Sequence, residues 1–324
     1  MGRRADHELP RRGGSRRSPG DVVVAQVVPR SVTPWDTAAR GRFVTSDGTA
    51  LHVVDEGPED AVATVVLVHA WTLDHTSWDR VASTLSRTVR VLRFDHRGHG
   101  GSAPAPFGTA TIAQLADDLA ELIADRVPTG PVVLAGHSIG GMTMMALAER
   151  NPDLVASRVT GAAFVATSSG GLDALTLGLP APVARVVMRG EGAVNARLAR
   201  VEHRALLAKP RLAEPGLRWL LFGRHPRRED VASAAEQVAR VHPASMVGFR
   251  ASLGDHDRRA ALAVFRDIPT LVLAGGADRL TPVGHSRVIA GELPSSELVI
   301  YPGAGHMLPL ERSLEVTARI GGLA

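Results

Sequence analysis

Short, mostly apolar runs recur along this sequence and alternate with amphipathic stretches. A run of this kind is typical of a strand that is buried on both faces of a parallel sheet. Between two of the runs, Thr111 precedes apolar residues at helical spacing, Leu115, Leu119 and Leu122, which predicts a capped helix packed on the sheet. The predicted strands cover residues 64–68, 89–94, 132–135, 158–165, 269–274 and 297–301.

This alternation predicts an α/β fold with a mostly parallel central sheet flanked by helices. A hairpin around Asp47-Gly48 precedes the first parallel strand. Residues 41–167 and 257–324 are predicted to form this core. Between them, residues 168–256 show helical patterns broken by prolines, which predicts a helical cap inserted into the core.

Residues 1–40 differ in composition and predict a disordered, arginine-rich tail. Arginine pairs stand there among Gly, Ser and Pro, and Arg16-Arg17 resembles a twin-arginine export signal. Polar and turn-forming residues, Ser18-Pro19-Gly20, follow where such a signal needs apolar ones. We therefore expect a cytoplasmic protein.

Composition excludes several kinds of site. The 324 residues are 44% hydrophobic and 22% charged, which is ordinary for a globular protein, and cysteine is absent. The net charge is +4, but no aromatic residues interleave the arginines as they do in single-strand nucleic-acid binders. No apolar run approaches the ~20 residues that span a bilayer. We expect no nucleic-acid partner and no integral membrane segment; the oligomeric state is not predicted.

Metal and cofactor motifs are not found either. The sequence contains neither H-E-x-x-H nor a phosphate-binding G-x-x-x-x-G-K-[ST]. Three consecutive residues, Asp255-His256-Asp257, cannot all face one ion in a regular element. We interpret His96 and His99 as structural turn residues, and we expect no metal and no cofactor.

The strongest single motif is Gly136-His137-Ser138-Ile139-Gly140. It stands between a predicted buried strand and a predicted helix, the context in which G-x-S-x-G indicates a nucleophile elbow. The sharp turn pushes the serine hydroxyl over the strand end, while Gly136 and Gly140 let strand and helix approach closely. His137 is interpreted as positional. A glycine-rich turn with an incidental serine is the alternative that this motif alone leaves open.

Two later turns supply partners for Ser138. Asp278 follows the strand at 269–274, and His306 follows the strand at 297–301. The carboxyl ends of parallel strands meet at one edge of a sheet, and the order Ser, Asp, His is the one expected after a nucleophile elbow. In this hypothesis His306 is the base for Ser138, and Asp278 holds the imidazole tautomer.

These motifs together resemble the α/β-hydrolase superfamily over residues 41–324. The resemblance is carried by His69-Ala70-Trp71, by the 95–102 turn (Asp-His-Arg-Gly-His-Gly-Gly-Ser), by the elbow and by the turns at 276–282 and 303–307. It is closest to esterase, lipase and cofactor-free peroxidase-type members common in actinobacteria. The resemblance implies an oxyanion hole made by the N–H groups of Trp71 and Ile139. Ala70 departs from the glycine usual in such members, which affects the expected shape of this loop.

The expected function is hydrolysis of a carboxylic ester with a small or apolar acyl group. A perhydrolase or C–C bond hydrolase with the same triad, or a non-catalytic ligand-binding homologue, remain alternatives. Dehalogenase and epoxide-hydrolase chemistry is disfavoured, because those relatives carry aspartate in place of Ser138. Candidate pocket residues in the predicted cap are Leu172, Leu175, Leu177, Leu179, Val183, Met188, Leu220, Phe222, Met246 and Phe249.

Overall fold

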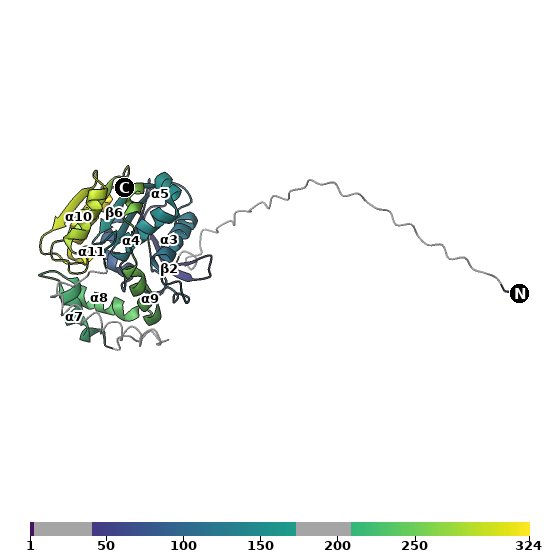
Figure 1. Cartoon of the computed structure of the whole chain (residues 1–324), viewed down its shortest axis with the longest axis horizontal. Helices are drawn as coiled ribbons and strands as arrows, with labels where there is room; N and C mark the ends of the chain where they lie inside the picture. The colour runs from purple at the N-terminus through teal and green to yellow at the C-terminus, as the bar shows by residue number, and fades with distance from the viewer. Residues whose placement is uncertain (3–40, 173–208) are drawn as a thin grey trace. The chain divides into compact units, whose positions relative to one another are not determined.

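In the computed structural model the chain divides into two units, Met1–Asp36 and Thr37–Ala324. The structure describes residues 1–2, 41–172 and 209–324, which are the coloured parts of Figure 1. The predicted tail (all but its first two residues) and residues 173–208 of the predicted cap therefore lie outside the described residues. Every described helix and strand belongs to the second unit.

One eight-stranded sheet organises this unit, in the order β1-β2-β4-β3-β5-β6-β7-β8. Strand β2 pairs antiparallel with β1 and β4, and every other neighbouring pair is parallel. The predicted mostly parallel sheet is confirmed. The strands are β1 (Arg42–Val44), β2 (Ala50–Glu56), β3 (Thr64–Val68), β4 (Arg90–Phe94), β5 (Val132–His137), β6 (Val159–Val165), β7 (Thr270–Gly275) and β8 (Glu297–Tyr301).

The central strands are apolar because both faces of the sheet are covered. All five residues of β3 are buried, and the last four alternate between two hydrophobic clusters. Val66 and Val68 pack with the residues of one cluster, and Val65 and Leu67 with those of the other. Successive side chains of a strand point to opposite faces of the sheet, and here each face packs into a hydrophobic cluster, which explains why this strand has no polar face.

Helices cover the two faces of the sheet. Helices α3, α4 and α10 contribute to the first cluster, and α2 and α12 to the second. Thr111 caps α3 as predicted, its side chain accepting a hydrogen bond from the Gln114 N–H. The helical elements of this core are η1 (His75–Trp78), α2 (Asp79–Leu85), α3 (Ile112–Arg126), α4 (Ile139–Arg150), α5 (Pro152–Arg158), η3 (Ala260–Phe265), α10 (Val283–Glu292), α11 (Leu308–Glu311) and α12 (Ser313–Gly321).

Between β6 and η3, the described part of the predicted cap is helical. Helices α7, α8 and α9 gather below α3 and α4 in Figure 1. Within residues 209–256 the structure contains no strand. The assignment of 168–256 as a cap stays a prediction. The elements here are η2 (Pro210–Leu212), α7 (Glu214–Leu221), α8 (Arg228–Arg240) and α9 (Pro243–Gly254).

A buried ion pair fixes the turn that follows β4. The Arg97 guanidinium is fully buried and donates to both carboxylate oxygens of Asp118 on α3, at 2.7 and 2.5 Å. A further guanidinium nitrogen donates to Asp47 at 2.7 Å. Burial of a charge is costly unless it is paired in this way, so the pair joins the 95–102 turn to α3 and to the first hairpin.

No helix in the described ranges, 41–172 and 209–324, combines the length and hydrophobicity that crossing a bilayer requires.

Candidate active site

Ser138 stands at the sharp turn between β5 and α4. Its backbone has φ 54° and ψ −116°, a conformation that a non-glycine residue adopts only under constraint. A Cβ atom on Gly140 would lie 2.3 Å from the Val68 carbonyl oxygen, and one on Gly136 would lie 2.5 Å from the backbone of Gly140. Both glycines are therefore required for strand and helix to approach, as the sequence motif predicts.

Asp278 and His306 meet beyond the ends of β7 and β8. His306 Nδ1 lies 2.8 Å from Asp278 Oδ2, and both side chains are buried. Thr281 Oγ1 also donates to Asp278 Oδ2 at 2.8 Å, and the N–H groups of Leu280 and Thr281 donate to Oδ1. Burial alone would raise the pKa of Asp278, but His306 and these donors hold it below its usual value. The carboxylate is thus kept ionised beside the imidazole.

Ser138 and His306 open into one cavity of about 370 Å³. Among the described residues that line it, Arg250 is the one with a permanent charge. Most of the others are apolar, so the cavity suits an apolar group. The apolar lining residues are Ala70, Trp71, Leu73, Met142, Leu172, Leu217, Leu220, Leu221, Val238, Leu253, Leu280 and Met307.

Histidines fix the loop that follows β3, His69–Thr72. His69 Nε2 accepts the His96 N–H at 2.9 Å, and its Nδ1 donates to the Ala70 carbonyl oxygen at 2.8 Å. His99 Nε2 accepts the Thr72 N–H at 3.2 Å. Burial lowers the pKa of His69 well below its usual value and that of His99 to about 4, so both rings stay neutral and can accept these hydrogen bonds.

This loop carries Trp71, one of the two residues expected to form the oxyanion hole, and Ala70, which replaces the glycine usual at that position. Ala70 is 2% exposed and packs with apolar residues including Leu73 and Met307, so its methyl group fills space in a small core. Trp71 lines the cavity. Within the described residues, its backbone N–H has no hydrogen-bond acceptor. Ile139 is the first residue of α4, where N–H groups have no partner inside the helix.

Comparison with known proteins agrees with this architecture. Residues 63–313 match the sequence profile of the alpha/beta hydrolase fold family. The chain belongs to this family. A thermophilic esterase from Thermogutta terrifontis superposes with a TM-score of 0.69 at 26% identity, covering 86% of this chain and 94% of the esterase.

Two curated relatives of this α/β-hydrolase differ in how much they share with it. The pimeloyl-[acyl-carrier protein] methyl ester esterase of Chromobacterium violaceum is 29% identical over 79% of this chain and 90% of the esterase. The probable oxidoreductase EphD of Mycobacterium tuberculosis is 38% identical over 108 residues, which are 33% of this chain and only 18% of EphD.

Two further side chains support the loop of His306. His137 belongs to the elbow motif, but its partner could not be predicted from the sequence, and Glu311 belongs to no motif. His137 Nε2 donates to the His306 carbonyl oxygen at 2.8 Å, and burial lowers the pKa of His137 to about 3. Glu311 accepts the N–H groups of Gly305 and Gly223, each at 2.9 Å. Sequence reasoning missed Glu311, because a glutamate in a short helix carries no signal of the backbone it will bind.

Helix α8 is joined to the loop after β3 by polar contacts. Asp74 Oδ2 pairs with Arg240 at 2.5 Å, and the Asp74 N–H donates to Gln237 at 3.2 Å. Arg80 on α2 pairs with Asp230 at 2.6 Å. Helix α8, whose Val238 lines the cavity, is thus attached to α2 and to the segment that follows β3.

The candidate pocket residues have different positions in the structure. Leu172 and Leu220 line the cavity. Phe222 and Phe249 are buried in hydrophobic clusters and do not line the cavity. Met246 is half-buried and does not line the cavity either. Outside the described residues lie Leu175, Leu177, Leu179, Val183 and Met188.

Proposed function

We propose that this α/β-hydrolase cleaves carboxylic esters through an acyl-enzyme formed on Ser138. The observation that carries the proposal is the Asp278–His306 pair at 2.8 Å, which opens into the same cavity as a strained elbow serine. In this assignment Asp278 accepts from His306 Nδ1, which leaves Nε2 to act as the base for the serine hydroxyl.

The reaction then has two halves. Ser138 Oγ attacks the ester carbonyl carbon, and His306 takes the hydroxyl proton and passes it to the departing alkoxide, which leaves as the alcohol. Water next attacks the acyl-enzyme, with His306 again taking the proton, and the acid leaves while Ser138 regains its hydrogen. Asp278 stabilises the imidazolium that forms in each half.

The N–H groups of Trp71 and Ile139 are proposed to bind the oxyanion. Their support is the position of Trp71 on the cavity wall and of Ile139 at the first turn of α4. Loss of one such donor typically costs about 2.7–4 kcal/mol of transition-state stabilisation. The His99 bond to the neighbouring Thr72 N–H would hold the loop in register for this role.

The apolar lining favours an ester whose acyl or alkyl part is a hydrocarbon of small or moderate size. A cavity of about 370 Å³ lies in the range of small-molecule sites. The methyl ester esterase of Chromobacterium violaceum and the Thermogutta terrifontis esterase support this reaction type, but they do not indicate which ester this chain cleaves.

The test is hydrolysis of p-nitrophenyl esters from acetate to decanoate by wild type and by Ser138→Ala. Ser157→Ala on α5 is a matched control, since its hydroxyl is exposed and only bonds a helix carbonyl. We expect turnover to be lost in Ser138→Ala and kept in Ser157→Ala, with both variants folded. Turnover that survives in Ser138→Ala would show that another nucleophile acts.

A fluorophosphonate probe separates an enzyme from a binding protein. Labelling of wild type and Ser157→Ala, but not of Ser138→Ala, supports an activated serine. A folded wild type that neither labels nor hydrolyses any ester of the series would make this chain a non-catalytic member of the family.

A further inference from the structure

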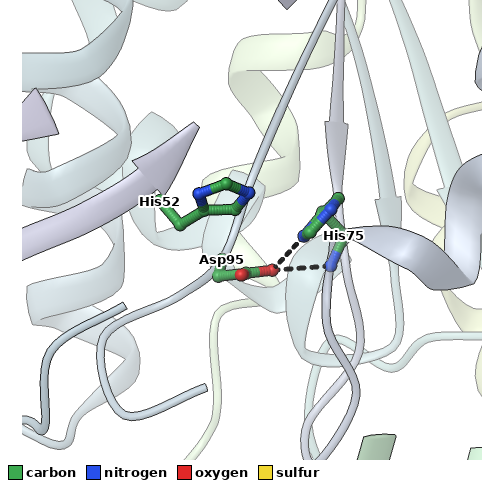
Figure 2. Close-up of side chains that lie close together, drawn as sticks. All are labelled: His52, His75 and Asp95. Carbon is green, nitrogen blue, oxygen red and sulfur yellow. Dashed lines mark hydrogen bonds and ion pairs between the residues drawn. The ribbon is translucent and has the colours of Figure 1, made fainter. Parts of the chain in front are cut away.

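A second group of polar side chains converges at residues that do not line the Ser138 cavity. His52 is on β2, His75 begins η1, and Asp95 directly follows β4. The side chains point toward one another in Figure 2. One ligand atom from each, an imidazole nitrogen or a carboxylate oxygen, lies within 4.8 Å of the other two.

The two imidazoles differ in how they are bonded. His75 Nδ1 lies 2.7 Å from Asp95 Oδ1, and the His75 N–H donates to the same oxygen at 2.7 Å. The His52 ring packs against the His75 ring with centroids 4.8 Å apart. Within the described part of the chain, no hydrogen bond reaches a ring nitrogen of His52 or the Nε2 of His75. Unused nitrogen lone pairs therefore remain beside a buried carboxylate.

The backbone holds the three residues in fixed relation. The Asp95 N–H donates to the His52 carbonyl oxygen at 2.9 Å, across neighbouring strands. The Gly101 N–H donates to Asp95 Oδ2 at 2.7 Å, and a Cβ on Gly100 would lie 2.2 Å from that oxygen. The carboxylate is thus oriented by its surroundings before any ligand arrives, as a preorganised site requires.

We propose that His52, His75 and Asp95 form a binding site for a divalent transition-metal cation of the Zn²⁺ type. Two imidazoles and one carboxylate are donors that Zn²⁺ and its neighbours prefer, and three protein ligands leave a position for water. His52 and His75 are half-buried while Asp95 is fully buried, so the cation reaches the carboxylate past the two rings.

Binding would replace a proton with the cation. Where His75 Nδ1 donates to Asp95 Oδ1, the metal takes the place of that proton, and Nε2 takes up a proton from water, so the ring stays a neutral imidazole that binds through Nδ1. The His75 N–H remains bonded to Asp95 and orients the carboxylate from outside the metal shell. The cation would then join β2, η1 and the turn that follows β4, and the site does not depend on the proposed esterase activity.

The site can be tested on the full-length chain without an affinity tag. Zn²⁺ is titrated by calorimetry into the chelator-treated protein, and thermal unfolding is followed with and without Zn²⁺. The variants are His52→Ala, which removes a ligand with no protein hydrogen bond, and His75→Gln, whose amide can still donate to Asp95. His225→Ala is the matched control, because His225 is exposed on the segment between α7 and α8.

We expect one Zn²⁺ per chain in wild type and in His225→Ala, with a Tm that rises by about 2 °C or more. Affinity should fall by roughly tenfold or more in both His52→Ala and His75→Gln, each of which keeps the circular-dichroism spectrum of wild type. No binding by wild type overturns the proposal. Binding that is unchanged in His52→Ala also overturns it, because the zinc then sits on other histidines of the 13 in the chain.

Discussion

The carboxylate of Glu311 connects the loop of His306 to the end of α7 through two hydrogen bonds. Replacing this carboxylate with the neutral amide of glutamine should break one of them. In Glu311→Gln, one amide oxygen can accept only one of the two N–H groups, Gly305 or Gly223, that the carboxylate accepts at 2.9 Å. The amide NH₂ then faces the other N–H, donor against donor. The substitution removes one charge-assisted hydrogen bond without changing the size of the side chain.

The expected cost is set by these contacts. Hydrogen bonds to a charged group contribute about 1.5–3 kcal/mol, and a buried N–H left unpaired costs about 1–3 kcal/mol. Since both figures describe the same lost bond, we expect about 2–3 kcal/mol less stability. A shifted loop misplaces His306, whose N–H bonds the Leu221 carbonyl oxygen at 2.8 Å, so kcat should fall about tenfold, equivalent to about 1.4 kcal/mol. KM should change little, because Glu311 does not line the cavity.

Urea unfolding followed by tryptophan fluorescence measures the stability term, and initial rates on the preferred p-nitrophenyl ester measure kcat and KM. The matched control is Glu315→Gln on α12, where the side chain is exposed. If Glu311→Gln unfolds within about 0.5 kcal/mol of Glu315→Gln and keeps its kcat, Glu311 does not hold the loop. A rise in KM without a fall in kcat would instead place the effect on the cavity wall.

Three other substitutions or conditions have clear expected results. Gly140→Ala puts a Cβ 2.3 Å from a β3 carbonyl oxygen, so it should lower the free energy of unfolding by about 1–3 kcal/mol and abolish ester turnover. In the control Gly291→Ala the Cβ meets nothing within 4 Å, so urea unfolding should show a neutral or stabilising effect. Asp118→Ala removes the fully buried carboxylate that pairs with Arg97 and leaves the more exposed Asp47 to compensate the charge, so it should cost about 3 kcal/mol. Its neighbour Asp117→Ala breaks an exposed pair and should cost about 1 kcal/mol or less. For His137, whose pKa is lowered from 6.5 to about 3, only the unfolded chain gains a proton just below pH 6.5. The contribution of neutral His137 to the free energy of unfolding is therefore complete above that pH. It declines as the pH falls and is smaller by about 2 kcal/mol at pH 5. A His137→Gln variant with the same pH dependence of unfolding as wild type would contradict this assignment.

Much of the fold follows from local patterns in the sequence. Runs such as residues 64–68 are apolar without alternation, and only a strand covered on both faces places every such side chain out of water. The glycines around Ser138 are required by contacts closer than 3 Å, which is why a short motif could predict a strand, a turn and a helix. Asp278 and His306 could be proposed because parallel strands deliver their following turns to one edge.

Other features depend on contacts between distant segments. The cap helices have apolar faces, but the sequence does not say whether such a face meets the cavity or a core. Phe249 is buried in a core cluster, whereas Leu253, one turn along α9, packs against the same cluster and also lines the cavity. Helical periodicity finds an apolar stripe and cannot tell which neighbour will cover each part of it.

By itself, the sequence determined the α/β architecture, the elbow and the order of Ser138, Asp278 and His306, because these depend on periodicity and on steric demands within a few residues. Only the tertiary structure decided the rest: the Glu311 hydrogen bonds, the cavity wall and the His52–His75–Asp95 cluster. Those residues belong to strands and turns far apart in the chain, and no spacing rule relates them. Their chemistry arises from hydrogen bonds that exist only after the sheet and its helices have packed.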